Sequence, residues 1–281
     1  MILITGAAGK TGRALIKRGE PLRALARRPE QAEALKALGV DEVIVGDLLE
    51  GPAVKRAASG VRAIYHIAPN VSPHETVIGK NVIAAAQSAE VERFVFHSVL
   101  HPQVEAMPHH WQKMRVEEAL FESGLSFTIL QPTAYMQNLL AYWQSICERG
   151  VYAVPYPPQT RLSLVDLDDV AEAAAIVLTE PGWLGATLEL VGTPPLSQTE
   201  VAETLSRHLK RPVQAAAVPL ETWEQNARSG GMDEYSLAAL KQMFRYYAQH
   251  GLVGNPSVLK FVLRRQPTSL DEFVEKTLRE R

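Results

Sequence analysis

The sequence predicts an α/β protein with a doubly wound, mostly parallel sheet and a smaller, mainly helical C-terminal lobe. Short apolar runs of strand length alternate with helical patterns as far as Pro132, where this rhythm stops. Glycines follow the first apolar run at once. The chain has 281 residues, of which 46% are hydrophobic, so it can bury a large core.

Six strands are expected before Pro132, and they alternate with helices as βαβ units require. The expected strands are residues 1–5, 22–26, 42–45, 63–67, 94–98 and 127–130. Helical patterns follow the glycines and cover residues 30–38, 75–89 and 113–122. Gly39 is a normal stop signal for the helix before it.

The second half reads mostly as helix. Helices are expected over 136–147, over 168–178, over 198–209 behind a capping box of Ser197 and Glu200, and at the end of the chain behind Ser269. Residues 187–191 and 213–218 read as strands, and 151–161 shows no clear period. We therefore expect one domain over 1–193 and a smaller substrate lobe over 194–281, with parts of 133–166 as further candidates for the lobe.

The first strand is followed by Gly6, Gly9 and Gly12 and then by residues that favour a helix. This order is typical of the dinucleotide-binding fingerprint of a Rossmann sheet, although the usual spacing is G-x-G-x-x-G. Gly6 would allow the tight turn, Gly9 the close approach of a pyrophosphate, and Gly12 close packing of the helix on the sheet. The helix N-terminus would favour a negative charge. The loop residues expected at the cofactor are Gly6, Ala8, Gly9, Lys10, Thr11 and Gly12.

The same residues have two other possible interpretations. Residues Gly9-Lys10-Thr11 look like the end of a P-loop, but that motif needs a glycine five residues before Gly9, where Ile4 stands. A glycine-rich turn without a ligand is the other alternative. The strand–turn–helix order favours the dinucleotide site over it.

The end of the second strand decides the type of dinucleotide. An acidic residue there binds the ribose of NAD, whereas an arginine accommodates the 2′-phosphate of NADP. Here Arg27 and Arg28 follow the strand, Pro29 fixes them from the other side, and no acid appears before Glu30. The prediction is therefore NADP(H), with Lys10 adding positive charge. The alternative is that both are solvated surface arginines.

Composition excludes several classes. Lys and Arg number 29 against 31 Asp and Glu, so nothing indicates a nucleic-acid or anionic membrane surface. Charges interrupt every apolar run before it could span a membrane, and the first run is too short for a signal peptide. One cysteine, Cys147, fits a reducing compartment and reads as a core residue. We expect a cytoplasmic monomer or homodimer that acts on a small molecule.

Four segments together carry a family resemblance: TGAAGKTG, ARRP after the second strand, GDL at 46–48, and HSVLHP at 97–102. With LVDLDDVAEAA at 164–174, they resemble the NmrA-like group of atypical short-chain dehydrogenases, which includes NADPH-dependent quinone reductases and triphenylmethane reductase. The resemblance implies further cofactor contacts at Asp47, Leu48, Ala68, Pro69, Asn70, Ser98, Pro132 and Thr133. Without it, Asp47 reads as an ordinary helix-capping residue.

The chain departs from the Tyr-x-x-x-Lys pair of typical short-chain dehydrogenases. His109 stands where the tyrosine would be, four residues before Lys113. The resemblance implies that Lys113 is a cofactor and active-site residue, and the alternative is a solvated helix lysine. His109 could donate a proton at working pH, or could simply be exposed at the start of the helix.

The remaining candidates concern a metal and a substrate pocket. His97, His101, His109 and His110 match no compact metal motif, and His97 reads as a core histidine of a strand, so no metal is predicted. An aromatic substrate pocket is suggested by Trp111, Tyr135, Met136 and Asn138, which could equally be core residues.

The predicted function is NADPH-dependent reduction of a flat, electron-poor molecule such as a quinone. A quinone needs little acid catalysis, so the missing tyrosine is tolerable. A non-catalytic NADP(H)-sensing regulator is the alternative favoured by that absence. A nucleotide-sugar epimerase ranks last, because its chemistry needs the tyrosine.

Overall fold

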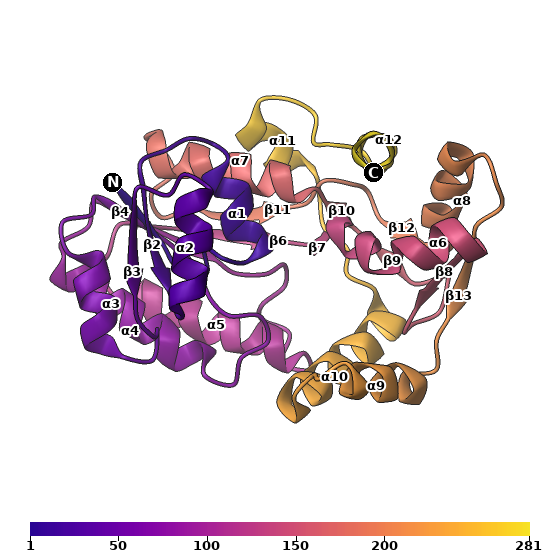
Figure 1. Ribbon diagram of the computed structural model, residues 1–281, viewed down its shortest axis with the longest axis horizontal. Helices are drawn as coiled ribbons and strands as arrows, with labels where there is room; N and C mark the ends of the chain where they lie inside the picture. The colour runs from indigo at the N-terminus through magenta and orange to yellow at the C-terminus, as the bar shows by residue number, and fades with distance from the viewer. The chain divides into compact units, whose positions relative to one another are not determined.

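The computed structural model describes residues 1–281, which divide into two compact units that are described separately here (Figure 1). Unit 1 consists of residues 1–103, 110–131 and 170–188. Unit 2 consists of residues 104–109, 132–169 and 189–281. The lobe expected from residue 194 lies entirely in unit 2, and so do residues 133–166.

The central sheet has seven strands in the order β11-β6-β5-β4-β1-β2-β3. Its strands are β1 (Ile2–Ile4), β2 (Leu22–Ala26), β3 (Glu42–Val45), β4 (Ala63–Ile67), β5 (Arg93–His97), β6 (Phe127–Pro132) and β11 (Thr187–Leu190). Pairing from β3 through β6 is parallel throughout. The order reverses at β1, so the predicted doubly wound sheet is confirmed. Strand β5 ends at His97, so Ser98 lies just beyond it.

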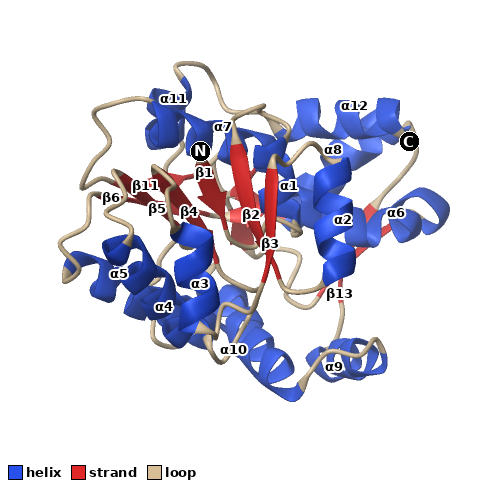
Figure 2. Cartoon of the chain, turned by 60° about the vertical axis from the view of Figure 1, so that its left-hand side comes forward, coloured by secondary structure: helices blue, strands red, loops and turns tan.

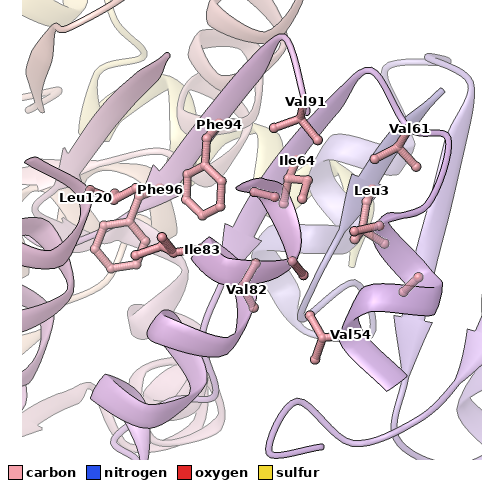
Figure 3. Close-up of a cluster of buried hydrophobic side chains, with 14 of the residues drawn as sticks. Leu3, Val54, Val61, Ile64, Val82, Ile83, Val91, Phe94, Phe96 and Leu120 are labelled. Atoms are coloured by element: carbon pink, nitrogen blue, oxygen red, sulfur yellow. The ribbon is translucent and has the colours of Figure 1, made fainter. Parts of the chain in front are cut away.

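Helices cover both faces of this sheet (Figure 2). They are α1 (Lys10–Ile16), α2 (Pro29–Ala37), α3 (Gly51–Ala58), α4 (Glu75–Ser88), α5 (Pro108–Phe121) and α7 (Leu167–Thr179). Sequence analysis missed α3. Right-handed crossovers place α3, α4 and α5 together on one face. The core there is one apolar cluster that includes Leu3, Val54, Ile64, Val82 and Phe94 (Figure 3).

Unit 2 holds short strand pairs and most of the C-terminal helices. Its strands are β7 (Ala134–Tyr135), β8 (Val151–Val154), β9 (Arg161–Leu162), β10 (Leu164–Val165), β12 (Leu196–Ser197) and β13 (Gln214–Ala217). Its helices are the 3-10 helix η1 (Met136–Tyr142), α6 (Trp143–Arg149), α8 (Gln198–Leu209), α9 (Leu220–Ser229), α10 (Glu234–His250), α11 (Ser257–Leu263) and α12 (Leu270–Glu280).

Most helix starts predicted for the second half of the chain can be compared directly with the observed helices. The predicted capping box of Ser197 and Glu200 opens α8, and the predicted cap Ser269 opens α12, where Glu272 completes a second box. The single helix expected over 136–147 was wrong, because the chain runs as η1 first and becomes α-helical only at Trp143. Cys147 is half-buried on α6 and is not a core residue.

Unit 2 contains a buried carboxylate in the first turn of α7. Asp169 is 1% exposed and accepts hydrogen bonds from Arg265 at 2.6 Å and from the Thr268 backbone N–H at 2.6 Å. Within unit 2, Asp169 is thus joined to the connection between α11 and α12. Separately, none of the helices is both long and apolar enough to cross a membrane.

Candidate functional site

The glycine loop, residues 6–12, connects β1 to α1 at the carboxyl ends of the strands. Gly6 has φ +64°, and a Cβ there would lie 2.7 Å from the Ile67 carbonyl oxygen. A Cβ on Gly12 would lie 2.4 Å from the Ala7 Cα. Gly6 therefore makes the tight turn as expected. Gly12 lets α1 approach the loop itself, where we had expected an approach to the sheet.

The outer part of the glycine loop presents bare backbone. Gly9 is exposed and is the N-cap of α1, without any side-chain cap. A Cβ on Gly9 would meet only the Gly6 carbonyl oxygen, at 3.2 Å. The guanidinium of Arg13, a residue of α1, donates to the Ala8 carbonyl at 3.0 Å and so links the helix to the loop. Lys10 is exposed and Thr11 is buried.

Two arginines follow β2 beside this loop, because β1 and β2 pair directly with Ile4 opposite Ala24. Arg27 is 78% exposed at its side chain, and its Nε lies 3.9 Å from an Asp47 carboxylate oxygen. Arg28 is also exposed, and its backbone N–H donates to the Gln31 side chain at 3.1 Å. Both guanidinium groups thus remain open to solvent at the end of the strand.

Asp47 and Leu48 follow β3. The Asp47 carboxylate accepts the Leu49 N–H at 2.9 Å within a turn, and the N-cap of α3 is Glu50. The helix-capping alternative for Asp47 was therefore wrong. Leu48 is half-buried, and its carbonyl accepts from the Asn81 side chain at 3.0 Å. After β4, Ala68 is buried while Pro69 and Asn70 are exposed.

The lysine cluster, formed by Lys113, Glu75, Phe96 and the His97 carbonyl, lies beyond the carboxyl ends of β4 and β5. Lys113 Nζ lies 2.6 Å from a Glu75 carboxylate oxygen, and the two side chains are 8% and 0% exposed. Nζ also donates to the His97 carbonyl at 3.4 Å and lies 5.6 Å from the centre of the Phe96 ring. Lys113 is therefore a buried, ion-paired residue, and the alternative of a solvated helix lysine was wrong.

A second buried carboxylate lies one helical turn further along α5. Glu117 is 3% exposed and accepts hydrogen bonds from the Ser98 hydroxyl and, at 2.9 and 3.0 Å, from the Gln131 side-chain amide. Burial raises the pKa of Glu117, while these hydrogen bonds and the charge of Lys113 oppose that rise. The Ser98 hydroxyl is thus fixed by its neighbour on α5.

Three histidines around the site are buried and neutral at pH 7. Burial, and then the charge of Lys113, lowers the pKa of both His66 and His97 to about 3. Burial also lowers the pKa of His110 to about 4, against hydrogen bonds with backbone groups. His97 shares a 2.6 Å hydrogen bond with the Tyr65 hydroxyl, so the prediction of a core histidine is confirmed. His109, on the first turn of α5, is half-buried.

The remaining predicted residues divide between the units. Trp111 is half-buried in unit 1, with the Arg115 guanidinium 5.5 Å from its ring centre. In unit 2, Met136 is fully buried, Tyr135 is half-buried and Asn138 is exposed. Pro132 and Thr133 are buried, and the Thr133 hydroxyl donates to the Ser163 carbonyl at 2.9 Å. An aromatic substrate pocket from these residues stays a prediction.

Sequence analysis missed the partners that hold the predicted residues. Glu75 entered the sequence analysis only as the first residue of a predicted helix, and Glu117 only as part of the helix predicted over 113–122. No local signal could have found either, because Glu75 and Lys113 come from different helices. A glutamate at 0% exposure is visible only once the fold is known.

Comparisons with known proteins show which family and which solved structures the chain resembles. The model of the NmrA-like family matches residues 1–276. An NAD(P)H azoreductase of Xenophilus azovorans is 30% identical over 98% of this chain and 97% of its own length. The structure of the Escherichia coli NADPH-dependent quinone oxidoreductase QOR2 complexed with NADPH superposes with a TM-score of 0.86 at 26% identity, covering 99% of this chain and 100% of that one. Citrobacter sp. triphenylmethane reductase complexed with NADP(H), at 23% identity and a TM-score of 0.85, covers 98% of this chain and 99% of its own and supports the fold.

Proposed function

Since the chain belongs to the NmrA-like family, we propose that it is an NADPH-dependent oxidoreductase that reduces a small, electron-poor, quinone-like molecule. When bound, NADPH would supply the hydride. The observation that carries the proposal is the geometry of the glycine loop beside the solvent-exposed side chains of Arg27 and Arg28.

The residues present fit a dinucleotide. At Gly6 and Gly12 a Cβ would collide with backbone, so the loop is folded as tightly as a pyrophosphate cradle requires. Gly9 exposes bare backbone at the start of α1, where N–H groups lack intrahelical partners. The 2′-phosphate of NADPH would be bound by Arg27 and Arg28, since arginine matches phosphate in both charge and geometry. Relatives whose names include NADPH or NAD(P)H also support NADPH as the dinucleotide.

The other cofactor contacts are proposed from the family resemblance and from position. Asp47 and Leu48 would lie at the adenine, and Ala68 to Asn70 beside the middle of the cofactor. Pro132 and Thr133 would border the nicotinamide, and Ser98 and Lys113 are proposed as further cofactor contacts. The Lys113 ammonium would bind the cofactor close to the reacting ring.

A quinone-like substrate is proposed because the tyrosine acid of typical short-chain dehydrogenases is absent. The buried histidines near Lys113 are neutral at pH 7, and His109 stands where related enzymes carry a tyrosine. Reduction of a quinone gives an oxyanion that delocalises its own charge, so orientation of the two rings and exclusion of water are the main requirements. The relative named a quinone oxidoreductase supports this substrate class.

The test is NADPH oxidation by the purified protein with a panel of quinones and azo dyes, with NADH run in parallel. The proposal predicts turnover that prefers NADPH. Tight NADPH binding without turnover of any acceptor would instead favour a non-catalytic sensor of NADP(H). Failure to bind either dinucleotide would overturn both candidates.

A further inference from the structure

The ion pair between Glu75 and Lys113 is the most deeply buried one of unit 1. Glu75 is the first residue of α4, and Lys113 lies on the second turn of α5. Their charged atoms are 2.6 Å apart, and the side chains are 0% and 8% exposed. Burying two charges costs desolvation energy that their attraction only partly returns, so apolar residues of similar size would serve the fold equally well. The pair therefore invites a functional explanation.

The ion pair does not use all the N–H donors of the Lys113 ammonium. An ammonium group has three N–H donors. One points to the Glu75 carboxylate at 2.6 Å and one to the His97 carbonyl at 3.4 Å, and the Phe96 ring lies 5.6 Å away. Lys113 makes no other hydrogen bond in this chain, so one donor is left. The Lys113 side chain is 8% exposed, so it is not fully enclosed by the protein.

Glu75 is also the carboxylate that balances the Lys113 charge directly. The titratable groups that face Lys113 are Glu75 from α4, His66 from β4, His97 from β5, and His110 and Glu117 from α5. The three histidines are neutral at pH 7, and Glu117 already accepts hydrogen bonds from Ser98 and Gln131. Without Glu75, Lys113 would be a buried ammonium without a contacting anion, and burial would lower its pKa.

We propose that Glu75 is the positioning residue of Lys113: it keeps the ammonium charged and fixed so that the remaining N–H can bind the dinucleotide. The inference rests on the proposed function, because it assigns the dinucleotide as the ligand of that N–H. Glu75 does not touch the ligand in this account. It acts through Lys113.

The variant that tests this is Glu75→Gln, which keeps the shape of the side chain and removes its charge. Two properties are measured between pH 6 and 9: the Kd of NADPH, and the titration of the Lys113 side chain by NMR of labelled lysine. In the wild type, the Kd of NADPH is expected to be constant through this range. In Glu75→Gln, the Lys113 pKa falls, and above it the Kd rises about tenfold per pH unit, because one proton must be taken up on binding.

A matched control separates this effect from the loss of any buried ion pair. Asp169→Asn breaks the pair with Arg265, which is also 2.6 Å long with its carboxylate 1% exposed, in unit 2. It should weaken stability and leave the pH dependence of NADPH binding unchanged. The double variant Glu75→Leu/Lys113→Met removes both charges and remains informative if Glu75→Gln fails to fold. It should fold and bind NADPH about 10- to 100-fold more weakly at every pH, as expected for loss of a charged hydrogen bond.

The outcomes are distinguishable. If the wild type binds no dinucleotide, the proposed function falls and this inference with it. If the wild type binds NADPH and Glu75→Gln binds it equally at all pH values, only the inference is overturned. Wild-type affinity in the double variant would likewise overturn it, because the pair would then be purely structural.

Discussion

Two regions at the carboxyl ends of the strands of unit 1 differ in exposure and in charge pairing. Beyond β1 and β2, the glycine loop with Arg27 and Arg28 is exposed, cationic and formed by residues close together in the sequence. Beyond β4 and β5, the lysine cluster is buried and its charges are paired between two helices. The first region is open to a ligand through its backbone, and the second offers one donor on a fixed side chain. Both regions should therefore contribute to the affinity for NADPH, and the second should also fix the orientation of the cofactor.

The largest expected effect is in the lysine cluster. Lys113→Met leaves the Glu75 carboxylate buried without its cation, which should lower the free energy of unfolding by about 3–5 kcal/mol. Urea unfolding of the single and double variants measures it. Adding Glu75→Leu to Lys113→Met should recover most of that loss. Equal stability of wild type and Lys113→Met would show that the pair is not formed in solution.

The next effect concerns the glycine loop. Gly6→Ala places a Cβ 2.7 Å from the Ile67 carbonyl oxygen at φ +64°, and should cost about 1–2 kcal/mol of backbone strain plus about 1–3 kcal/mol of overpacking. Gly39→Ala is the control, because Gly39 also has a positive φ (+90°) but open space around it. It should cost the strain alone and keep NADPH binding. Titration of both variants with NADPH checks this, and unimpaired binding by Gly6→Ala would remove the loop from the site.

The arginines should decide between dinucleotides. Arg27→Ala/Arg28→Ala should raise the Kd of NADPH about 10- to 100-fold, the equivalent of about 1.5–3 kcal/mol for a charged hydrogen bond, and change the Kd of NADH little. Lys55→Ala/Arg56→Ala removes the same charge from the last turn of α3, before β4 begins, and serves as control. A parallel loss for NADPH and NADH in the arginine variant would contradict recognition of the 2′-phosphate.

The smallest effect is a pH dependence of stability in the buried region. His66 has a pKa of about 3 in the folded protein against 6.5 for the free side chain, so the unfolded chain binds one more proton between these values. Stability from this histidine is complete above pH 6.5 and falls on acidification, by about 1.4 kcal/mol per pH unit. In His66→Asn, the slope of unfolding free energy between pH 6 and 4.5 should be smaller by that amount. An unchanged slope would mean that His66 is not buried and neutral.

The same contrast explains what could be predicted from the sequence. The strands of the sheet and the glycine loop follow from local patterns, because turns, strands and helix starts depend on neighbouring residues. The roles of Gly6 and the exposure of Arg27 and Arg28 belong to this class. The prediction for Gly12 was only partly correct. A spacing motif indicates that a close approach exists, but not which atoms come into contact.

The lysine cluster could not be predicted in the same way. Lys113 was singled out by a family resemblance, but its partner Glu75 lies 38 residues away on another helix. Which charged side chains are buried together depends on how α4 and α5 pack on the sheet. The same holds for the bond between Ser98 and Glu117, and for the pKa values of the buried histidines, which depend on desolvation.

The central claim is that the two regions together hold NADPH for reduction of an electron-poor acceptor. The most direct measurement is a single turnover in which the protein is saturated with NADPH, mixed with a simple benzoquinone, and followed by the absorbance of the reduced nicotinamide. We expect rapid loss of that absorbance, slowed when the transferred hydrogen of NADPH is deuterium. Bound NADPH that stays reduced with every acceptor tried would contradict it.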